Sequence, residues 1–246
     1  QAVRATGEAR RQFLAAAGGA VAALTLAPGV LLLAPAYGRA PDQPATGKVR
    51  WGLLVDTTKC ASGCADCVSA CNRENGLSGR TGPTDAQWIR KIDLKHLRSG
   101  RQASLPMMCQ HCAAPPCVDV CPTGASFKRA DGIVLVDKHI CIGCRYCMMA
   151  CPYKARSLVH EPVTGQNPDV PRGKGTVESC TLCVHRVDRG ELPACVAACA
   201  AAGHRAIVFG DLNDPASEIA QRVARHPSLQ VRADLGLDPG VRYQGI

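Results

Sequence analysis

The distribution of apolar residues predicts a first segment that differs from the rest of the 246-residue chain. Between residues 12 and 38 no side chain is charged, and the apolar run 13–36 is rich in Ala and Leu. About 20 helical residues cross a bilayer, so this run is long enough to span one. Arginines precede it, and positive charge on that side favours a cytoplasmic N-terminus. We therefore expect a transmembrane signal anchor over residues 1–38, followed by a linker over 39–48.

The residues just before the apolar run resemble an export signal. The sequence RRQFL at residues 10–14 is similar to a twin-arginine signal, the address for export of folded proteins. An ordinary anchor with two flanking arginines is the alternative interpretation. Small residues at 34–36 would permit cleavage. We expect an uncleaved anchor instead, which would hold the chain at the periplasmic side of the bacterial inner membrane.

Beyond residue 48 the pattern changes to short strands separated by turn formers. The strand-like runs are Arg50–Val55, Trp88–Asp93, Gly132–Asp137 and Arg205–Phe209. The second run alternates in polarity and predicts a strand of an inserted hairpin. Residues 161–179 contain several Pro and Gly and predict a long loop. Asp214-Pro215 predicts the capped start of a short helix. Its expected inner face consists of Ala216, Ile219, Ala220 and Val223.

Composition points to cysteine as the residue that carries the chemistry. The chain has 16 cysteines, whereas aromatic residues are only 4 % of the total. The formal charge of +9 suggests nucleic-acid binding, but the Lys and Arg residues are scattered and lack interleaved aromatics. We therefore expect no nucleic-acid partner. Bound metal–thiolate clusters, each carrying about −2, would offset most of this positive charge.

The cysteines fall into four consecutive sets of four. The sets are Cys60, Cys64, Cys67, Cys71; Cys109, Cys112, Cys117, Cys121; Cys141, Cys144, Cys147, Cys151; and Cys180, Cys183, Cys195, Cys199. The third set, with Pro152, matches the bacterial ferredoxin run C-x₂-C-x₂-C-x₃-C-P at every position. Three thiolates on such a tight loop can hold three corners of a cubane. The fourth points toward a second cluster, and Gly143 permits close approach of the backbone.

Two other interpretations of the cysteines compete with iron–sulfur clusters. A disulfide framework is typical of small secreted domains, and thiols three residues apart on a short loop rarely meet disulfide geometry. Structural zinc favours two CxxC pairs with a longer spacer, which the fourth set alone resembles. Zinc would make the chain a structural scaffold. Iron–sulfur clusters fit all four sets, so we expect four [4Fe–4S] clusters with the sixteen cysteines as iron ligands.

The cysteine sets divide the chain into two ferredoxin-like modules, one inserted in the other, in an α+β fold. The inner two-cluster module covers residues 109–160. The outer module is split into a first half, 49–108, which includes the inserted hairpin, and a second half, 161–212. A C-terminal helix and tail follow over 213–246. This nested arrangement indicates an internal duplication.

The cysteine-containing segments resemble the four-cluster iron–sulfur subunits of membrane-bound molybdenum oxidoreductases and their relatives. The segments are "CQHCAAPPCVDVCPTGA", "VDKHICIGCRYCMMACPYKAR", "CTLCVHRVDRGELPACVAAC" and "FGDLNDPASE". The resemblance implies one cluster on Cys60, Cys64, Cys67 and Cys199; a second on Cys71, Cys180, Cys183 and Cys195; a third on Cys109, Cys112, Cys117 and Cys151; and a fourth on Cys121, Cys141, Cys144 and Cys147. The chain departs from the family pattern in the three residues between Cys60 and Cys64, and in lacking a proline after Cys199.

The resemblance also implies an electron-transfer role. Within the family, the twin-arginine-type start combined with "RWGLLVDTTKCASGCADCVSAC" is most similar to the O subunits of DsrMKJOP, the transmembrane complex associated with dissimilatory sulfite reductase. A polytopic quinone-interacting membrane subunit and a multihaem cytochrome c subunit would then be the partners. The alternative is the electron-transfer β subunit of a periplasmic molybdopterin oxidoreductase or hydrogenase. Because no nucleophile–base pair or phosphate-binding motif occurs, we expect no catalytic residue in the chain.

Four cationic or titratable residues near the cysteines have less obvious roles. His111 and His185 lie close to cysteines in sequence, but every set already has four thiols. We expect both histidines to support the sites or lie at the surface. We expect Lys154 and Arg156 to offset cluster charge rather than bind a substrate.

Overall fold

A computed structural model describes residues 43–77, 82 and 84–246 of the chain. The expected signal anchor, residues 1–38, lies outside the described residues. Within the described part, no helix combines the length and the apolar character needed to cross a membrane. The membrane anchor therefore stays a prediction from sequence.

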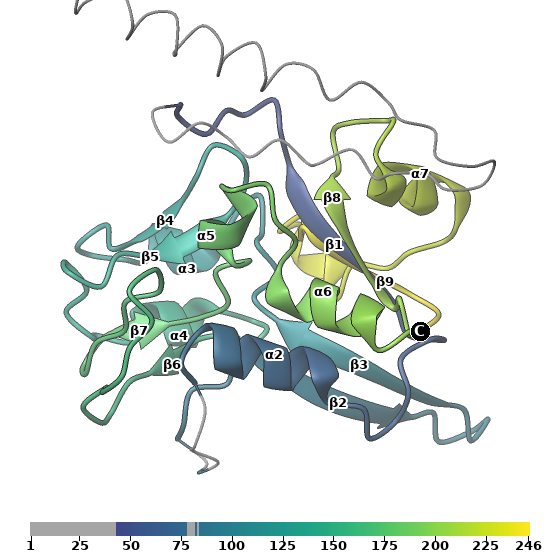
Figure 1. Cartoon of the computed structure of the whole chain (residues 1–246), viewed down its shortest axis with the longest axis horizontal. Helices are drawn as coiled ribbons and strands as arrows, with labels where there is room; N and C mark the ends of the chain where they lie inside the picture. Colours follow the sequence, from purple (N-terminus) through teal and green to yellow (C-terminus); the bar gives the residue numbers. More distant parts are fainter. Residues whose placement is uncertain (1–42, 78–81, 83) are drawn as a thin grey trace, which may run out of the picture. The chain divides into compact units, whose positions relative to one another are not determined.

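Three strands form the central sheet (Figure 1). Strand β1 (Trp51–Asp56) lies between β8 (Ile207–Asp211) and β9 (Val241–Gln244), antiparallel to β8 and parallel to β9. β1 and β8 were predicted to within two residues at either end, whereas β9 was not predicted. Because β1 has a neighbour on each side, it is buried along almost its whole length, which its apolar run WGLLV suits.

The two faces of β1 pack against different parts of the protein, as the alternation of a strand requires. Leu53 faces a core rich in cysteine and methionine, whereas Leu54 packs with Val208 and Ile219. Ile219 belongs to helix α7 (Glu218–Arg225) and is fully buried. The predicted helix is therefore present, with Ile219 on its inner face as expected.

The predicted start of α7 is wrong. Ser217 caps the helix, since its hydroxyl accepts a hydrogen bond from the Ala220 N–H at 3.2 Å. Ala216 precedes the helix and is exposed rather than on the inner face. The carboxylate of Asp214 instead accepts from the backbone of Ala216 and stabilises the turn before the cap.

The predicted inserted hairpin is present. It consists of β2 (Ile89–Lys95) and β3 (Gln102–Met108), paired in register from Ile89 opposite Met108 to Lys95 opposite Gln102. The end at Ile89 and Met108 is buried beside Trp88, and the other end projects into solvent. The second cysteine set begins at Cys109, immediately after the buried end of β3.

The remaining elements are short and connect the cysteine-bearing loops. They are α2 (Asp66–Glu74), α3 (Pro116–Asp119), β4 (Ser126–Lys128), β5 (Val134–Val136), α4 (Tyr146–Ala150), β6 (Ser157–Leu158), β7 (Val177–Glu178), α5 (Val184–Val187), α6 (Ala194–Ala201) and the 3₁₀ helix η1 (Ala233–Leu235). β4 pairs with β5 and β6 with β7, so most of the predicted loop 161–179 joins β6 to β7, but its end forms the strand β7. Helix α2 packs on α6, and α3 packs on α4. Each cysteine-bearing helix pair thus brings together sets that are separated in sequence.

Candidate metal centres

All sixteen cysteines lie in the described part of the chain, and all are free thiols. The disulfide interpretation is therefore wrong for these residues. Eleven thiols are buried, and five are only half-buried. The half-buried ones are Cys60, Cys64, Cys121, Cys141 and Cys144.

Three small cavities of similar size are each lined by four cysteines. We call them sites 1 to 3. Site 1 contains Cys60, Cys64, Cys67 and Cys199; site 2 contains Cys71, Cys180, Cys183 and Cys195; and site 3 contains Cys109, Cys112, Cys117 and Cys151. In each cavity three thiols come from one sequence set and the fourth from another. This is the grouping that the family resemblance implies.

The remaining four cysteines, which we call site 4, comprise three half-buried thiols and the buried Cys147, whose charged neighbours include Cys141 and Cys121. The four residues are Cys121, Cys141, Cys144 and Cys147. Backbone N–H groups point at two of their sulfurs, from Ser126 to Cys121 Sγ at 3.3 Å and from Val177 to Cys141 Sγ at 3.4 Å. These N–H donors offset negative charge on sulfur, as they do around metal-bound thiolates.

The loops that carry the thiols adopt conformations suited to wrapping a compact group. Gly143 has φ +68°, and a Cβ at this position would lie 2.1 Å from the carbonyl oxygen of Gly175. Only glycine fits this close approach. Arg145 before α4 and Cys183 before α5 are also left-handed, so both helices begin immediately after a tight turn of the thiol loop.

The environment of the thiols favours a bound cationic group. Burial, together with neighbouring sulfurs, raises the pKa of Cys67 to about 11 and that of Cys109 to about 12. Thiolates in such pockets need compensating positive charge, which a metal ion or cluster supplies. Four sulfurs around a small cavity suit tetrahedral zinc as well as an iron–sulfur cluster, so the donor set fits the expected group without selecting it.

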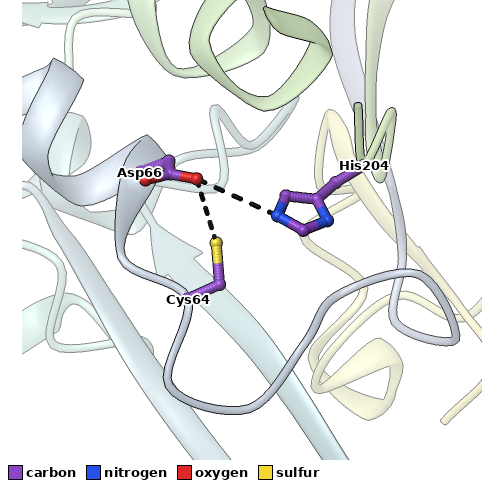
Figure 2. Close-up of side chains that lie close together, drawn as sticks. All are labelled: Cys64, Asp66 and His204. Atoms are coloured by element: carbon purple, nitrogen blue, oxygen red, sulfur yellow. Dashed lines mark hydrogen bonds and ion pairs between the residues drawn. The ribbon is translucent and has the colours of Figure 1, made fainter. Parts of the chain in front are cut away.

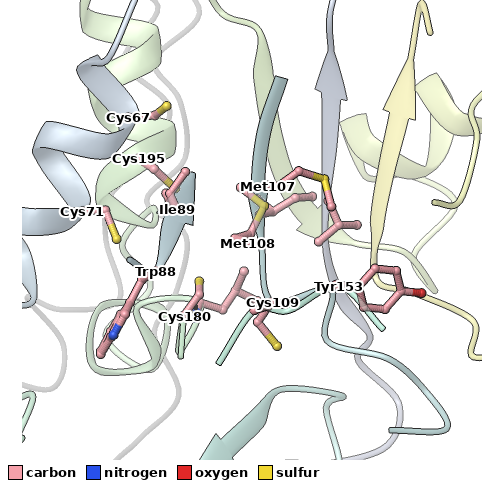
Figure 3. Packing of buried hydrophobic residues seen from close by; sticks show 14 of the residues in the cluster. Cys67, Cys71, Trp88, Ile89, Met107, Met108, Cys109, Tyr153, Cys180 and Cys195 are labelled. Carbon is pink, nitrogen blue, oxygen red and sulfur yellow. Dashed lines mark hydrogen bonds between the residues drawn. The ribbon is translucent and has the colours of Figure 1, made fainter. Parts of the chain in front are cut away.

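The four sites follow one another in space. Cys67 of site 1 and Cys71 of site 2 lie one turn apart on α2, and the charge of Cys67 contributes to raising the pKa of Cys71. Cys180 of site 2 has Cys109 of site 3 among its charged neighbours, and Figure 3 shows the two side chains close together. Cys117 of site 3 is likewise influenced by a thiol of site 4. The sites therefore form a row in the order 1, 2, 3, 4.

Site 1 has polar neighbours that were not predicted. Lys91 Nζ lies 2.8 Å from Cys60 Sγ. Figure 2 shows Cys64, Asp66 and His204 turned toward one another, with Cys64 Sγ 3.4 Å and His204 Nε2 3.9 Å from Asp66 Oδ2. Lys91 and His204 are far from Cys64 in sequence, and no local motif marked them. Asp66, Lys91 and His204 line the cavity of site 1 together with its four thiols.

The residues with uncertain roles are now placed. His111 is buried, and its Nδ1 accepts the Val134 N–H at 3.0 Å. Burial and two nearby arginines lower the pKa of His111 to about 3, so the ring is a neutral acceptor. His185 pairs with Glu74 at 2.7 Å. Lys154 is exposed, whereas Arg156 is buried.

Comparisons with known proteins select among the possible metals. A family model described as "4Fe-4S dicluster domain" matches residues 101–211. The chain is 41 % identical to "Hdr-like menaquinol oxidoreductase iron-sulfur subunit 1" of Archaeoglobus fulgidus, over 95 % of this chain and 97 % of that protein. The chain belongs to the 4Fe–4S dicluster family of iron–sulfur subunits. It is also 36 % identical to a subunit of tetrathionate reductase from Salmonella typhimurium, over 96 % of this chain and 88 % of that protein. Identity to "Protein NrfC" of Escherichia coli is 37 %, over 78 % of each chain.

Membership in the 4Fe–4S dicluster family confirms the expected cofactor. The four sets of cysteines correspond to four [4Fe–4S] clusters, and the zinc interpretation is not supported. The expected α+β ferredoxin-like dicluster fold is also confirmed. A 4Fe–4S dicluster subunit of this kind transfers electrons within a multi-subunit oxidoreductase complex.

Proposed function

We propose that the row of sites is a path along which single electrons cross the subunit. The observation that carries this proposal is the distribution of solvent exposure. The five half-buried thiols belong to sites 1 and 4, whereas every thiol of sites 2 and 3 is buried. [4Fe–4S] clusters, when bound, accept and release one electron at a time. The protein buries the thiols of sites 2 and 3 and leaves some thiols of sites 1 and 4 partly exposed to solvent. Electrons therefore enter at one terminal site and leave at the other.

We propose the ligand sets as the cavities and the family resemblance group them. Cluster 1 takes Cys60, Cys64, Cys67 and Cys199; cluster 2 takes Cys71, Cys180, Cys183 and Cys195; cluster 3 takes Cys109, Cys112, Cys117 and Cys151; and cluster 4 takes Cys121, Cys141, Cys144 and Cys147. The packing of α2 on α6 and of α3 on α4 supports this exchange of the fourth ligand within each module. It equally supports the outer and inner modules as proposed from sequence, with boundaries near 49, 109, 161 and 213.

The surface around site 4 supports its role as a terminal site. Large apolar side chains are exposed there just after α3, on β4, on α4 and on both sides of Cys141. They are Val120, Phe127, Ile140, Ile142, Tyr146 and Met149. Helix α3 contacts both α4 and β4, so these side chains share one region of the protein. Clusters of exposed apolar groups mark protein–protein contacts, and a redox partner docked here would lie against cluster 4.

We propose that the partners are a polytopic quinone-interacting membrane subunit and a multihaem cytochrome c subunit, in a complex like DsrMKJOP. The similarity to an iron–sulfur subunit of a menaquinol oxidoreductase supports a quinone-linked complex. The apolar run before residue 38 and the RRQFL sequence support a periplasmic location with an N-terminal membrane anchor.

A second candidate is the electron-transfer subunit of a periplasmic molybdopterin reductase. The similarity to the tetrathionate reductase subunit favours it. Both candidates assign the same path to this chain and differ only in the partner.

Isolation of the native complex tests both parts of the proposal. We expect about 16 iron atoms per chain from four clusters, with no stoichiometric zinc, and paramagnetic resonance signals after reduction with dithionite. Four zinc atoms without iron would refute electron transfer. Co-purification of c-type haem supports the first candidate, and co-purification of molybdopterin supports the second. Protease accessibility in spheroplasts tests the periplasmic location.

A further inference from the structure

Arg156 occupies an unusual position for a charged side chain. It lies immediately before β6, is only 5 % exposed, and lines the cavity of site 3. Among the described residues, none of its three side-chain nitrogens donates to an oxygen atom, and the acceptors nearest to them are the thiols of Cys117 and Cys147. Buried charges are normally paired because desolvation is costly. The unmet donors of Arg156 therefore call for a negative group at this place.

The groups that surround the Arg156 guanidinium are sulfurs of two different sites. Burial alone would lower the pKa of Arg156, but the charges of Cys117 and Cys109 in site 3 and of Cys147 in site 4 together raise it. The effect is reciprocal, since Arg156 counteracts the rise in pKa that burial imposes on Cys117 and Cys147. The guanidinium thus lies close enough to thiols of site 3 and of site 4 to interact electrostatically with both.

A half-buried arginine nearby, Arg50, shows that this arrangement is specific. Arg50 also lies near a site 3 thiol, and burial lowers its pKa. Its guanidinium donates to carbonyl oxygens, to His111 at 2.8 Å and to Gly132 at 3.2 Å. Arg50 therefore connects segments of the backbone, whereas Arg156 has no such bonds and has its donors free for a cluster and its sulfurs.

We infer that Arg156 is a counter-charge shared by clusters 3 and 4, and that it raises the reduction potentials of both. The inference rests on the proposed ligand sets. Reduction adds negative charge to a cluster, and a fixed positive charge in a buried, low-dielectric position favours that state. A guanidinium keeps its charge at every accessible pH. One cation near two clusters acts on both, so their reduction potentials shift in the same direction. The difference between the two potentials therefore changes little.

The test uses the complete chain in its native complex. Arg156→Gln removes the charge, Arg156→Lys keeps it on a smaller group, and Lys154→Gln removes an exposed charge from the same loop. Redox titrations followed by paramagnetic resonance give the midpoint potential of each cluster. We expect Arg156→Gln to lower the potentials of two clusters, Arg156→Lys to lower them less, and Lys154→Gln to leave all four unchanged.

The outcomes separate this inference from the proposed function. If Arg156→Gln retains about 16 iron atoms and no potential falls, or only one falls, the inference is wrong and the electron path stands. If the unaltered chain holds no iron–sulfur clusters, the proposed function itself is wrong. If Arg156→Gln cannot hold clusters, the neutral variant Arg156→Met decides: unchanged potentials with full iron content overturn the inference, and a joint decrease of two potentials supports it.

Discussion

Replacing Gly143 by alanine is expected to damage site 4 by a mechanism that the structure allows us to divide into two parts. The first part is conformational, because φ at Gly143 is +68°. The left-handed backbone conformation costs a residue with a Cβ about 1–2 kcal/mol of conformational energy. The second part is steric, since the new methyl group would meet the carbonyl oxygen of Gly175 at 2.1 Å. Forcing extra volume into a packed position costs about 1–3 kcal/mol.

Gly165 provides a matched control. Its φ is +62°, and a Cβ there would have no neighbour within 4 Å. Gly165→Ala therefore carries only the conformational part, about 1–2 kcal/mol, while Gly143→Ala carries about 2–5 kcal/mol. Any stabilisation from the reduced freedom of the unfolded chain is the same in both variants and cancels in the comparison.

Thermal unfolding at one scan rate, followed by loss of the visible cluster absorbance, measures the difference. For a protein of this size 1 kcal/mol corresponds to about 2–4 °C. We expect a decrease of about 2–8 °C for Gly165→Ala and a decrease larger by at least about 2 °C for Gly143→Ala. Paramagnetic resonance of Gly143→Ala should show one altered cluster and three unchanged ones. Equal decreases in the two variants, with four unchanged spectra, would refute the steric argument.

Three further substitutions test other contacts. Lys91→Met should lower the potential of cluster 1 alone, because it removes a cation 2.8 Å from one of the thiols, whereas Lys95→Met at the exposed end of the same strand should change nothing; redox titration decides. Arg172→Met should cost about 3–5 kcal/mol of unfolding free energy, because it leaves the fully buried carboxylate of Glu178 without the two hydrogen bonds of its guanidinium partner. Adding Glu178→Gln should recover part of that loss, and a double variant as unstable as the single one would contradict this account. Tyr243→Phe should cost about 1–3 kcal/mol in denaturant titrations, since the buried hydroxyl donates to a backbone carbonyl at 3.0 Å; an unchanged midpoint would mean that this bond contributes nothing.

The sequence-based predictions succeeded where the signal is local. The hairpin β2–β3 follows from alternation of polar and apolar residues, and the cysteine spacing indicates the metal chemistry without any tertiary information. β9 was missed because its four residues pair in parallel with β1, nearly 190 positions away, and no local pattern encodes such a partner. The start of α7 was misassigned because Asp214 and Ser217 are both good cap residues, and the final choice depends on where Ile219 can be buried.

The surroundings of the sites were largely beyond sequence reasoning. Lys91 lies on a strand whose pattern predicted only a hairpin, yet the fold brings it to Cys60. Lys154 and Arg156 were assigned one shared role because they lie two residues apart. The turn at β6 exposes the first and buries the second, and only tertiary packing separates them.

Ten of the 31 buried residues in the main hydrophobic cluster are cysteines that line the sites. About a third of the residues in this cluster are thus thiols whose expected neighbours are iron–sulfur clusters rather than other side chains. Without bound clusters, the newly made polypeptide would have cavities between these thiols, and cavities in a core are destabilising. The supply of iron and sulfide should therefore determine how long the polypeptide survives, because chains without clusters remain vulnerable to proteolysis. A shortage of iron in the cell would then reduce the amount of this protein even at a constant rate of synthesis.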